Sequence, residues 1–553
     1  MAKQQTPLRV IPLGGLDGIG KNMTAFEYGD DLVLVDAGLM FPDDEQPGVD
    51  LVLPDYSYVL ENEDKLRGIL ITHGHEDHTG SLPYLLMDLG RKVPIYSSKL
   101  TLGLIEGKLA EHKLNAPKFR EVKNGTHINL GAFSIDFFSQ THSIPAALGV
   151  YMRTPAGSVL HTGDFKLDQT PIDGRLPNYQ AINRFSTMGI DLLLSDSTNA
   201  TRPGYTPSEA TVGPSLRHII KNAAGRVFVA SFSSQIHRIQ QVCDAATCVG
   251  RKVVVTGRSM INNTRIAREL GYLKIDQDDL IDAYEVHDIP DEKIVVLCTG
   301  SQGEPMSALA RMANGDHKSL TITADDTVII SATPVPGNEK SVQGIINALS
   351  KIGCTIFDKS TTVVHVSGHA SQEELKLMLA MTRPRYFMPV HGEAVHLRAH
   401  ARLGEAMGVP RDHIFIADNG DTLEMRNGQV SWGQPVESGV VYVDGLNVTD
   451  SDPVVFRDRQ KLASDGIVTC VVTVSRRGGE VGDVALACRG VTFDSEGLVE
   501  DAQRLVKEQM SKRAHKSGSN LETLRKAARS ALSSYLWDKT RTRPMVIPVI
   551  MEV

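Results

Sequence analysis

The stretch Ile71–Gly80, "ITHGHEDHTG", places three histidines, an aspartate and a glutamate directly behind a short apolar run. His73 and His75 are separated by one residue, so in extended backbone their side chains point the same way. Asp77 and His78 follow where the chain is expected to turn into a helix, which directs them to a neighbouring point. One loop of this kind offers ligands for two adjacent metal ions.

The side-chain types in this loop restrict the metal. Imidazole and carboxylate ligands without a thiolate favour zinc, with manganese or magnesium as alternatives. The HxHxDH pattern is rare by chance, and its simpler interpretation is a set of histidines that cap a helix. A binuclear site needs further ligands, and His142 in "SQTHS" and Asp164 in "HTGDF" each follow a predicted strand. Taken singly, either residue could be an ordinary strand-end residue.

Composition indicates a large protein of several domains. A chain of 553 residues is too long for one ordinary core and predicts two to four domains. No run approaches the roughly 20 apolar residues that cross a bilayer, and the first residues lack the apolar centre of a signal peptide. We therefore expect a soluble, cytoplasmic protein with no membrane partner. The six cysteines are scattered without a CxxC pair, which favours buried, reduced thiols.

The charge distribution bears on nucleic-acid binding. The net charge of −8 argues against a protein that coats nucleic acid nonspecifically, but it allows a local basic channel. Residues 500–553 carry eleven Lys and Arg against six Asp and Glu. A solvated helical face is the simpler interpretation of this excess, and RNA contact is the alternative.

The pattern of predicted strands and helices changes along the chain. Up to about Asp196, short β-rich runs such as "LVLVDAG" end in histidine or aspartate, which is typical of a buried sheet. Strands then alternate with helical segments, which predicts a parallel sheet. After about Ser360 the first pattern returns in "TTVVHVSGHAS" and "RYFMPVHGE". We predict a first domain in two parts (1–205 and 361–435), an inserted α/β domain (206–360), a linker (436–450) and a small α+β domain (451–553).

Four motifs in order, "LVDAG", "HGHEDH", "SQTHS" and "HTGDF", resemble the metallo-β-lactamase fold, an αββα sandwich that binds two metals. Paired cations hold a hydroxide and polarise a scissile group, so hydrolysis is expected. Lactam, thioester, lactone and phosphodiester substrates all stay open at this point. The resemblance implies one metal held by His73, His75 and His142, a second by Asp77 and His78, a bridge at Asp164, and a steadying role for Asp36.

Three later motifs narrow the substrate. "SDST" at Asp196, "VSGHAS" around His369 and "PVHGE" at His391 resemble motifs A, B and C of the β-CASP nucleases, whose inserted domain closes over the metal site. This resemblance implies that His391 completes the second metal's ligands and that His369 contacts the scissile phosphate and protonates the leaving oxygen. It also groups Asp196 with Asp77 and Asp36 as catalytic carboxylates. A helix cap, a turn residue and a core histidine are the simpler interpretations.

Two strand-to-helix turns are candidate phosphate sites. Small residues in "SGHAS" let the backbone approach a ligand, and hydroxyls and amides at the start of the next helix can surround an anion. The expected pocket consists of His365, Val366, Ser367, Gly368, His369, Ala370 and Ser371. The turn "SFSSQIHR" offers a second set, with a plain helix cap as the alternative: Ser233, Ser234, His237 and Arg238.

Essentially the whole chain resembles the bacterial ribonuclease J family, and "TGSQGEPMSALARMA" is among its most specific stretches. The resemblance implies a 5′ to 3′ exoribonuclease that prefers a 5′ monophosphate on single-stranded RNA, with some endonuclease activity. It also implies roles in RNA decay and ribosomal RNA maturation, a homodimer or homotetramer formed through the last domain, and partners in an RNA-decay complex. The alternatives are a purely endonucleolytic β-CASP nuclease and a catalytically silent RNA-binding subunit.

One motif misleads. "GLDGIGKN", Gly15–Asn22, nearly spells a phosphate-binding P-loop, but Asn22 stands where a magnesium-binding hydroxyl is required. The residues that follow are typical of strand and turn, where a P-loop needs a helix. We therefore expect a glycine-rich hairpin turn near the metal site and no ATP binding.

Overall fold

The computed structural model describes residues 6–42, 46–335, 337–445, 447–450, 453–475, 480–491, 497–514 and 521–553. The chain divides into two compact units. The first unit comprises Met1–Phe41 and Leu51–Val441, and the second comprises Pro42–Asp50 and Tyr442–Val553. The grouping of the short segment Pro42–Asp50 with the C-terminal part was not expected from the sequence.

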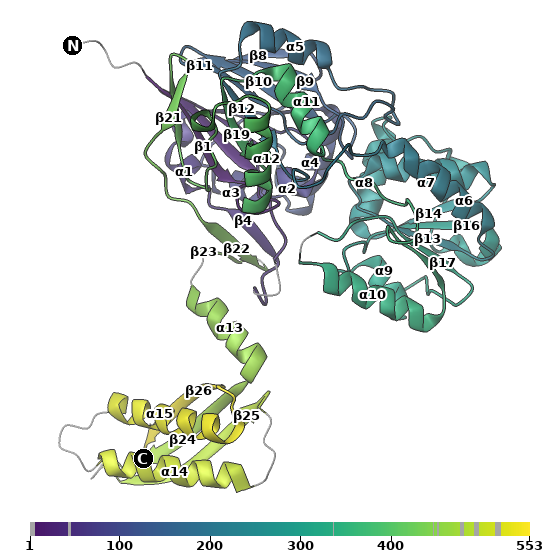
Figure 1. The fold of residues 1–553 in the computed structure, drawn as a ribbon. Coiled ribbons are helices and arrows are strands. Elements are labelled where there is room, and N and C mark those ends of the chain that lie inside the picture. Colours follow the sequence, from purple (N-terminus) through teal and green to yellow (C-terminus); the bar gives the residue numbers. More distant parts are fainter. Residues whose placement is uncertain are drawn as a thin grey trace, which may run out of the picture. The chain divides into compact units, whose positions relative to one another are not determined.

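Two sheets packed face to face form the sandwich of the first unit (Figure 1). One sheet has the order β21 (Gln429–Trp432), β20 (Leu423–Arg426), β1 (Leu8–Gly14), β2 (Met23–Tyr28), β3 (Asp31–Val35), β5 (Leu66–Leu70), β6 (Ile95–Ser97) and β7 (Phe119–Glu121). The other has the order β19 (Tyr386–Val390), β12 (Leu192–Asp196), β11 (Gly157–His161), β10 (Leu148–Thr154), β9 (Phe133–Ser139) and β8 (His127–Leu130).

Alternating apolar residues on the strands explain the layers. Val33 of β3 and Phe137 of β9 belong to one buried cluster that fills the space between the two sheets. Their neighbours along a strand point the other way, because successive side chains alternate across a sheet. Phe138 thus packs on Phe185 of a covering helix, with ring centroids 5.7 Å apart. The helices of this sandwich are α1 (Ser57–Glu61), α2 (Glu76–Thr79), α3 (Leu82–Asp88), α4 (Lys99–Glu111), α5 (Tyr179–Met188), α11 (Gln372–Thr382) and α12 (Ala394–Ala406).

The inserted domain is built on a parallel sheet, as its alternating pattern predicts. The strand order is β15 (Leu280–Ile281), β14 (Lys252–Thr256), β16 (Ile294–Cys298), β13 (Val227–Ala230), β17 (Thr327–Ile330) and β18 (Thr355–Phe357). β16 is buried along its whole length because helices pack on both faces. One face is covered by α6 (Val212–Asn222), α7 (Ile236–Cys248) and α8 (Arg258–Glu269), and the other by α9 (Ala308–Ala313) and α10 (Glu339–Ile352).

The inserted domain leaves and re-enters the sandwich through neighbouring strands. β12 and β19 pair in parallel, and Asp196 stands opposite Val390 in their register. Further along, β20 pairs with β1, so the last part of the first unit completes the sheet that the first residues begin. The ends of β12 and β19 therefore deliver residues to the same edge of the sandwich.

The second unit contains a small sheet covered by two helices. Its strands run in the order β25 (Val481–Arg489), β24 (Ile467–Val474) and β26 (Met545–Glu552), and α14 (Gly497–Ala514) and α15 (Leu521–Thr540) share one apolar core with them. This arrangement agrees with the predicted α+β domain. α13 (Pro453–Asp465) precedes β24. The stretch expected as a linker, 436–450, contains β22 (Val440–Asp444) and β23 (Asn447–Asp450), and β4 spans Leu51–Pro54.

Two expectations from composition can be compared with the structure. All six cysteines are unpaired, but Cys248 is exposed and Cys488 only partly buried, whereas the sequence predicted buried thiols. Among the described residues, no helix combines the length and the apolar character that crossing a bilayer demands.

The buried ion pair of the inserted domain generates a stability prediction. Arg226 donates to both carboxylate oxygens of Asp326, at 2.9 and 2.7 Å, and the Asp326 side chain is 1% exposed. Asp326→Ala leaves a buried guanidinium without its counter-charge, so we expect the free energy of unfolding to fall by about 3–5 kcal/mol. Urea denaturation followed by circular dichroism measures this loss.

An exposed ion pair in the same domain provides the control. Arg265 and Glu269 are 56% and 59% exposed and lie one helical turn apart on α8. Glu269→Ala should cost at most about 0.5 kcal/mol, because solvent screens such pairs. Equal losses in the free energy of unfolding for the two variants would show that burial does not increase the contribution of the Arg226–Asp326 pair to stability.

Candidate active site

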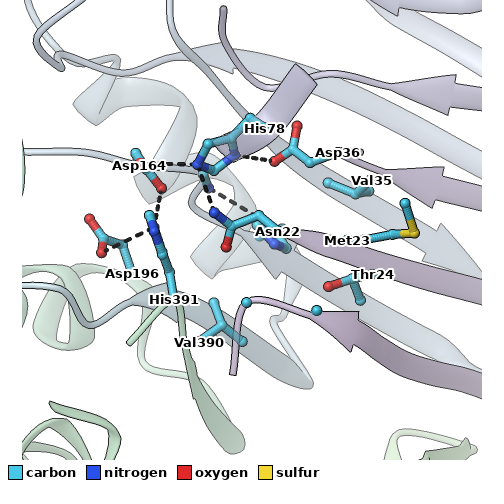
Figure 2. Close-up of a pocket in the computed structure, with 14 residues that line it drawn as sticks. Asn22, Met23, Thr24, Val35, Asp36, His78, Asp164, Asp196, Val390 and His391 are labelled. Atoms are coloured by element: carbon cyan, nitrogen blue, oxygen red, sulfur yellow. Dashed lines mark hydrogen bonds and ion pairs between the residues drawn. The ribbon is translucent and has the colours of Figure 1, made fainter. Parts of the chain in front are cut away.

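Six histidines and several carboxylates converge where strands of the sandwich end. Figure 2 shows one side of this cluster, with His78 and His391 beside Asp164. His73 and His75 follow β5, His142 follows β9, and Asp164 follows β11. His391 follows β19 in a left-handed conformation, with φ of +55°. Three groups among the described residues have ligand atoms that lie within 4.8 Å of one another: first His73, His75 and His142, second Asp77, His78, Asp164 and His391, and third Asp164, Asp196, His369 and His391.

The first group presents three nitrogens to one point. His75 Nδ1 lies 3.1 Å from His73 Nε2 and 3.2 Å from His142 Nε2. Burial lowers the pKa of His75 to about 4, and burial also holds the pKa values of His73 and His142 well below the ordinary histidine range. Neutral imidazoles keep a lone pair for a cation. His142 donates from Nδ1 to the Gly368 carbonyl at 2.8 Å, which leaves its Nε2 as the ligand atom.

The second group surrounds a buried carboxylate. Asp164 Oδ2 lies 3.2 Å from His78 Nε2, and Asp164 Oδ1 lies 2.8 Å from His391 Nδ1. Asp77 Oδ2 lies 3.5 Å from His78 Nε2 and 3.4 Å from His391 Nε2. Asp164 Oδ2 is also 3.7 Å from the ligand nitrogen of His73, in the first group. Asp164 thus lies between the two groups, where a bridging carboxylate would be.

The chemistry of this cluster fits divalent cations. Among the described residues, Asp164 Oδ2 and His391 Nε2 are buried without a hydrogen-bond partner, which is costly unless another group binds them. Although burial opposes the charged form, the nearby Asp164 and Asp77 carboxylates raise the pKa of His391 to about 10 and that of His78 well above its ordinary value. The carboxylates therefore require positive charge here, and a cation supplies it in place of protons.

Asp36 holds the histidine loop without facing the converging ligand atoms. Its Oδ2 accepts from His78 Nδ1 at 2.8 Å, and its Oδ1 accepts from the Thr72 amide at 2.8 Å (Figure 2). The residue follows β3 with φ of +61°. This strained conformation turns the carboxylate back under the loop. His78 is thereby left with Nε2 toward Asp164.

His369 and Asp196 form a pair at the edge of the cluster. His369 Nδ1 lies 2.8 Å from Asp196 Oδ2 and 3.9 Å from Asp164 Oδ2. The His369 side chain is 19% exposed, so a substrate can reach it. Burial opposes its charged form, but Asp196 outweighs burial and raises the pKa of His369. The structure thus places an imidazole paired with a carboxylate beside the cluster of candidate metal ligands.

The predicted phosphate pocket includes backbone groups that the fold already uses. At the N-terminus of α11, Glu374 Oε2 accepts from the Ser371 amide at 2.9 Å and the Ser371 side chain forms the capping box. Ala370 donates its amide to Phe165. The amides of Ala370 and Ser371 are thus hydrogen-bonded within the protein, and phosphate binding by this segment stays a prediction. His365 is partly exposed, its Nδ1 lies 3.5 Å from Arg238 Nη1, and burial together with Arg238 lowers its pKa to about 3.

Glycine is needed at position 368 for a different reason from the one expected. A Cβ atom at this position would lie 2.7 Å from the His142 imidazole. The backbone therefore approaches a histidine of the cluster rather than a ligand, and only glycine allows that distance. Ser367 remains a partly exposed member of the segment, and its Oγ accepts from Asn199 Nδ2 at 2.9 Å. Val366 is buried.

The second predicted set is wrong at Arg238. This side chain is fully buried and donates to Glu209 at 2.8 Å and to the Val364 carbonyl at 2.7 Å. Arg238 therefore joins the inserted domain to the segment that carries His369. His237 is also buried, 3.4 Å from a carboxylate oxygen of Asp173. Partly exposed residues of this turn are Ser233 and Ser234.

Sequence reasoning missed the role of Asn22. Its side-chain amide donates to the Asp77 carbonyl at 3.1 Å and lies 3.1 Å from His78 Nε2, and its backbone amide donates to the same carbonyl (Figure 2). β1 and β2 pair antiparallel, so Gly15–Asn22 is the expected hairpin turn. The asparagine in the place of the P-loop hydroxyl was the available signal, but nothing in the sequence linked it to Asp77.

Known protein families match successive segments of this chain. Family models match residues 19–198 (beta-lactamase superfamily domain) and 224–349 (ribonuclease J, beta-CASP domain). Two more match residues 359–417 (Zn-dependent metallo-hydrolase RNA specificity domain) and 454–553 (ribonuclease J C-terminal domain). The matched segments include every residue of the converging cluster.

Whole proteins show the same relationship. The chain is 42% identical to a ribonuclease J of Mycolicibacterium smegmatis, over 99% of this chain and 97% of the relative. It is 43% identical to a ribonuclease J of Thermus thermophilus, over 99% and 96%. A crystal structure of a protein of unknown function from Enterococcus faecalis V583 shares the fold, with a TM-score of 0.55 at 16% identity over 76% of this chain and 100% of that one. The chain belongs to the ribonuclease J family and is a hydrolytic ribonuclease of the metallo-β-lactamase fold with an inserted β-CASP domain.

Proposed function

We propose that this ribonuclease degrades single-stranded RNA from its 5′ end in the 5′ to 3′ direction, prefers a 5′ monophosphate, and has additional endonuclease activity. The observation that carries the proposal is the His369–Asp196 pair beside the Asp164 cluster, in a chain similar to ribonucleases J over its whole length. In this proposal the enzyme acts in cytoplasmic RNA decay and ribosomal RNA maturation, as a homodimer or homotetramer with RNA-decay partners.

The first two groups of ligand atoms support two divalent cations, with zinc as the first choice. The first ion would be held by His73, His75 and His142, and the second by Asp77, His78 and His391, with Asp164 between them. Such ions would polarise the scissile phosphate and stabilise the negative charge that develops on it. Within the described chain, every ligand implied by the family resemblance is present in the cluster, which argues against a catalytically silent subunit.

His369 is placed to supply a proton. Its Nδ1 donates to Asp196 Oδ2 at 2.8 Å, so the opposite ring nitrogen, Nε2, carries the proton that can be transferred. The Asp196 carboxylate opposes the effect of burial and raises the pKa of His369. The raised pKa favours the protonated imidazole, and we propose that this form protonates the leaving oxygen.

In this proposal the 5′ phosphate is recognised by hydroxyl groups that can still donate a hydrogen bond. Ser367 Oγ accepts hydrogen bonds from Asn199 and from the His369 amide, so its own O–H is left to donate. We propose that this hydroxyl, with those of Ser233 and Ser234, contacts the terminal phosphate. A phosphate bound there would place the first nucleotide next to His369.

Removal of a predicted ligand tests the hydrolytic site. We expect His75→Ala to reduce RNA cleavage to background while RNA binding persists, because one cation loses a ligand but the protein surface is retained. Cleavage of a labelled RNA on gels and its binding by fluorescence anisotropy measure the two effects. The control is His218→Ala, an exposed histidine of α6. Unchanged cleavage by His75→Ala would contradict the metal-dependent mechanism.

The chemistry of the RNA end tests the direction of attack. We expect a 5′-monophosphate RNA to be cut faster than its 5′-triphosphate or 5′-hydroxyl form, with single nucleotides released first. Products of the three RNAs resolved by size measure this. Equal rates with internal fragments only would favour a purely endonucleolytic β-CASP nuclease and would overturn the exonuclease proposal.

Asn22 generates a test that does not depend on activity. Asn22→Ala removes the side-chain donor to the Asp77 carbonyl and keeps the backbone donor, so the Asp77–His78 turn loses one of two supports. We expect divalent-cation affinity to fall about 10–100-fold, as for other partners of metal ligands. Calorimetric titration with zinc measures it. Asn62→Ala removes a comparable bond, 2.9 Å to the Tyr58 carbonyl, and should leave affinity unchanged. Equal affinity for wild type and Asn22→Ala would contradict the positioning role.

A further inference from the structure

A tryptophan near the end of α15, in the second unit, is flanked by two arginines. The Cζ atom of Arg543 lies 4.4 Å from the Trp537 ring centroid, and that of Arg541 lies 5.7 Å from it. Trp537 is 37% exposed, and both arginines are exposed. Each guanidinium is thus held against the ring, while its surface remains open to solvent.

The guanidinium groups of Arg541 and Arg543 form no ion pair with a carboxylate among the residues that the structure describes, although Asp465 Oδ2 accepts from the Arg543 backbone amide at 3.2 Å. The contacts with the ring attract each cation, but two like charges beside one ring repel each other. A bound polyanion would remove this repulsion, and a guanidinium can donate to phosphate while its plane stays on an aromatic ring.

The basic surface continues along the helix. Arg525, Arg529, Ser533 and Trp537 follow one another at intervals of four residues, so they form a ridge on one side of α15. Arg529 is exposed and likewise has no ion pair among the described residues, whereas Arg525 lies 3.9 Å from a carboxylate oxygen of Glu522. The adjacent row of α15, about 100° around the helix, is buried in the core of the unit through Leu524, Ala528, Leu532 and Leu536.

We propose that this α15 ridge, made of Arg525, Arg529, Trp537, Arg541 and Arg543, binds single-stranded RNA. Nucleic-acid sites of this kind combine cations that contact the backbone with an aromatic ring on which a base stacks. The ridge would hold the part of a long RNA that lies beyond the catalytic cluster. A second copy of the chain is the less favourable occupant, because a symmetric contact through this patch would bring the arginines of both copies together.

The test compares long and short RNA in the uncleaving His75→Ala background. We expect Arg541→Gln with Arg543→Gln to weaken binding of an RNA of about 30 nucleotides by about tenfold, and to leave an RNA of about 5 nucleotides unaffected. The slope of log affinity against log salt should decrease by about 1.4, which corresponds to two lost phosphate contacts. Fluorescence anisotropy measures both. Trp537→Ala should also weaken binding of the long RNA, and Trp537→Phe should restore most of it.

A matched charge change separates the ridge from general electrostatics. Arg504→Gln with Lys507→Gln removes the same charge from α14, where the Arg504 side chain is 79% exposed. An equal loss of affinity in this control would overturn the proposal, as would unchanged binding of the long RNA by the ridge variant. A changed oligomeric state with wild-type RNA affinity, measured by light scattering, would assign the ridge to contact between copies. Cleavage of short RNA tests the catalytic proposal separately.

Discussion

The buried carboxylate of Asp164 is the constraint on which the site depends. Its two oxygens lie 2.8 Å from His391 and 3.2 Å from His78, and two further histidines lie 3.7 Å away. A buried charge is tolerated only when such partners are held in place. These partners come from the ends of different strands. The register of both sheets therefore has to be maintained for the buried charge of Asp164 to be compensated. The large apolar core between the sheets provides that rigidity.

The inserted domain is connected to the segments that carry the residues around Asp164. β12 delivers Asp196, β19 delivers His391, and the segment between the inserted domain and α11 carries His369. Arg238 is fully buried where this segment leaves the domain, with hydrogen bonds to Glu209 and to the Val364 carbonyl. A charge that the sequence suggested for RNA contact is therefore used inside the protein. It ties the position of the His369 segment to the body of the inserted domain.

Local patterns made much of this fold predictable. The HxHxDH loop, the strand-end residues His142 and Asp164 and the return of the strand pattern after the insertion are signals within short windows of sequence. They indicated a buried sheet, the insertion and candidate metal ligands, and the resemblance to the metallo-β-lactamase fold implied the sandwich. What the sequence concealed are contacts between distant segments, since a hydrogen-bond partner has no local signature. Gly368 approaches His142 across 226 positions, and Glu374 takes the helix terminus that an anion was expected to occupy.

The pairing of β12 with β19 also has a consequence for synthesis of the enzyme. Asp196 and His391 lie side by side in the fold, but the ribosome makes them about 200 residues apart. At about 5–20 residues per second, roughly 10–40 seconds separate the two. Throughout that interval the nascent chain lacks His391, and until shortly before its end it also lacks His369. A ribonuclease that emerges beside its own messenger RNA thus stays incomplete until the whole inserted domain has been translated.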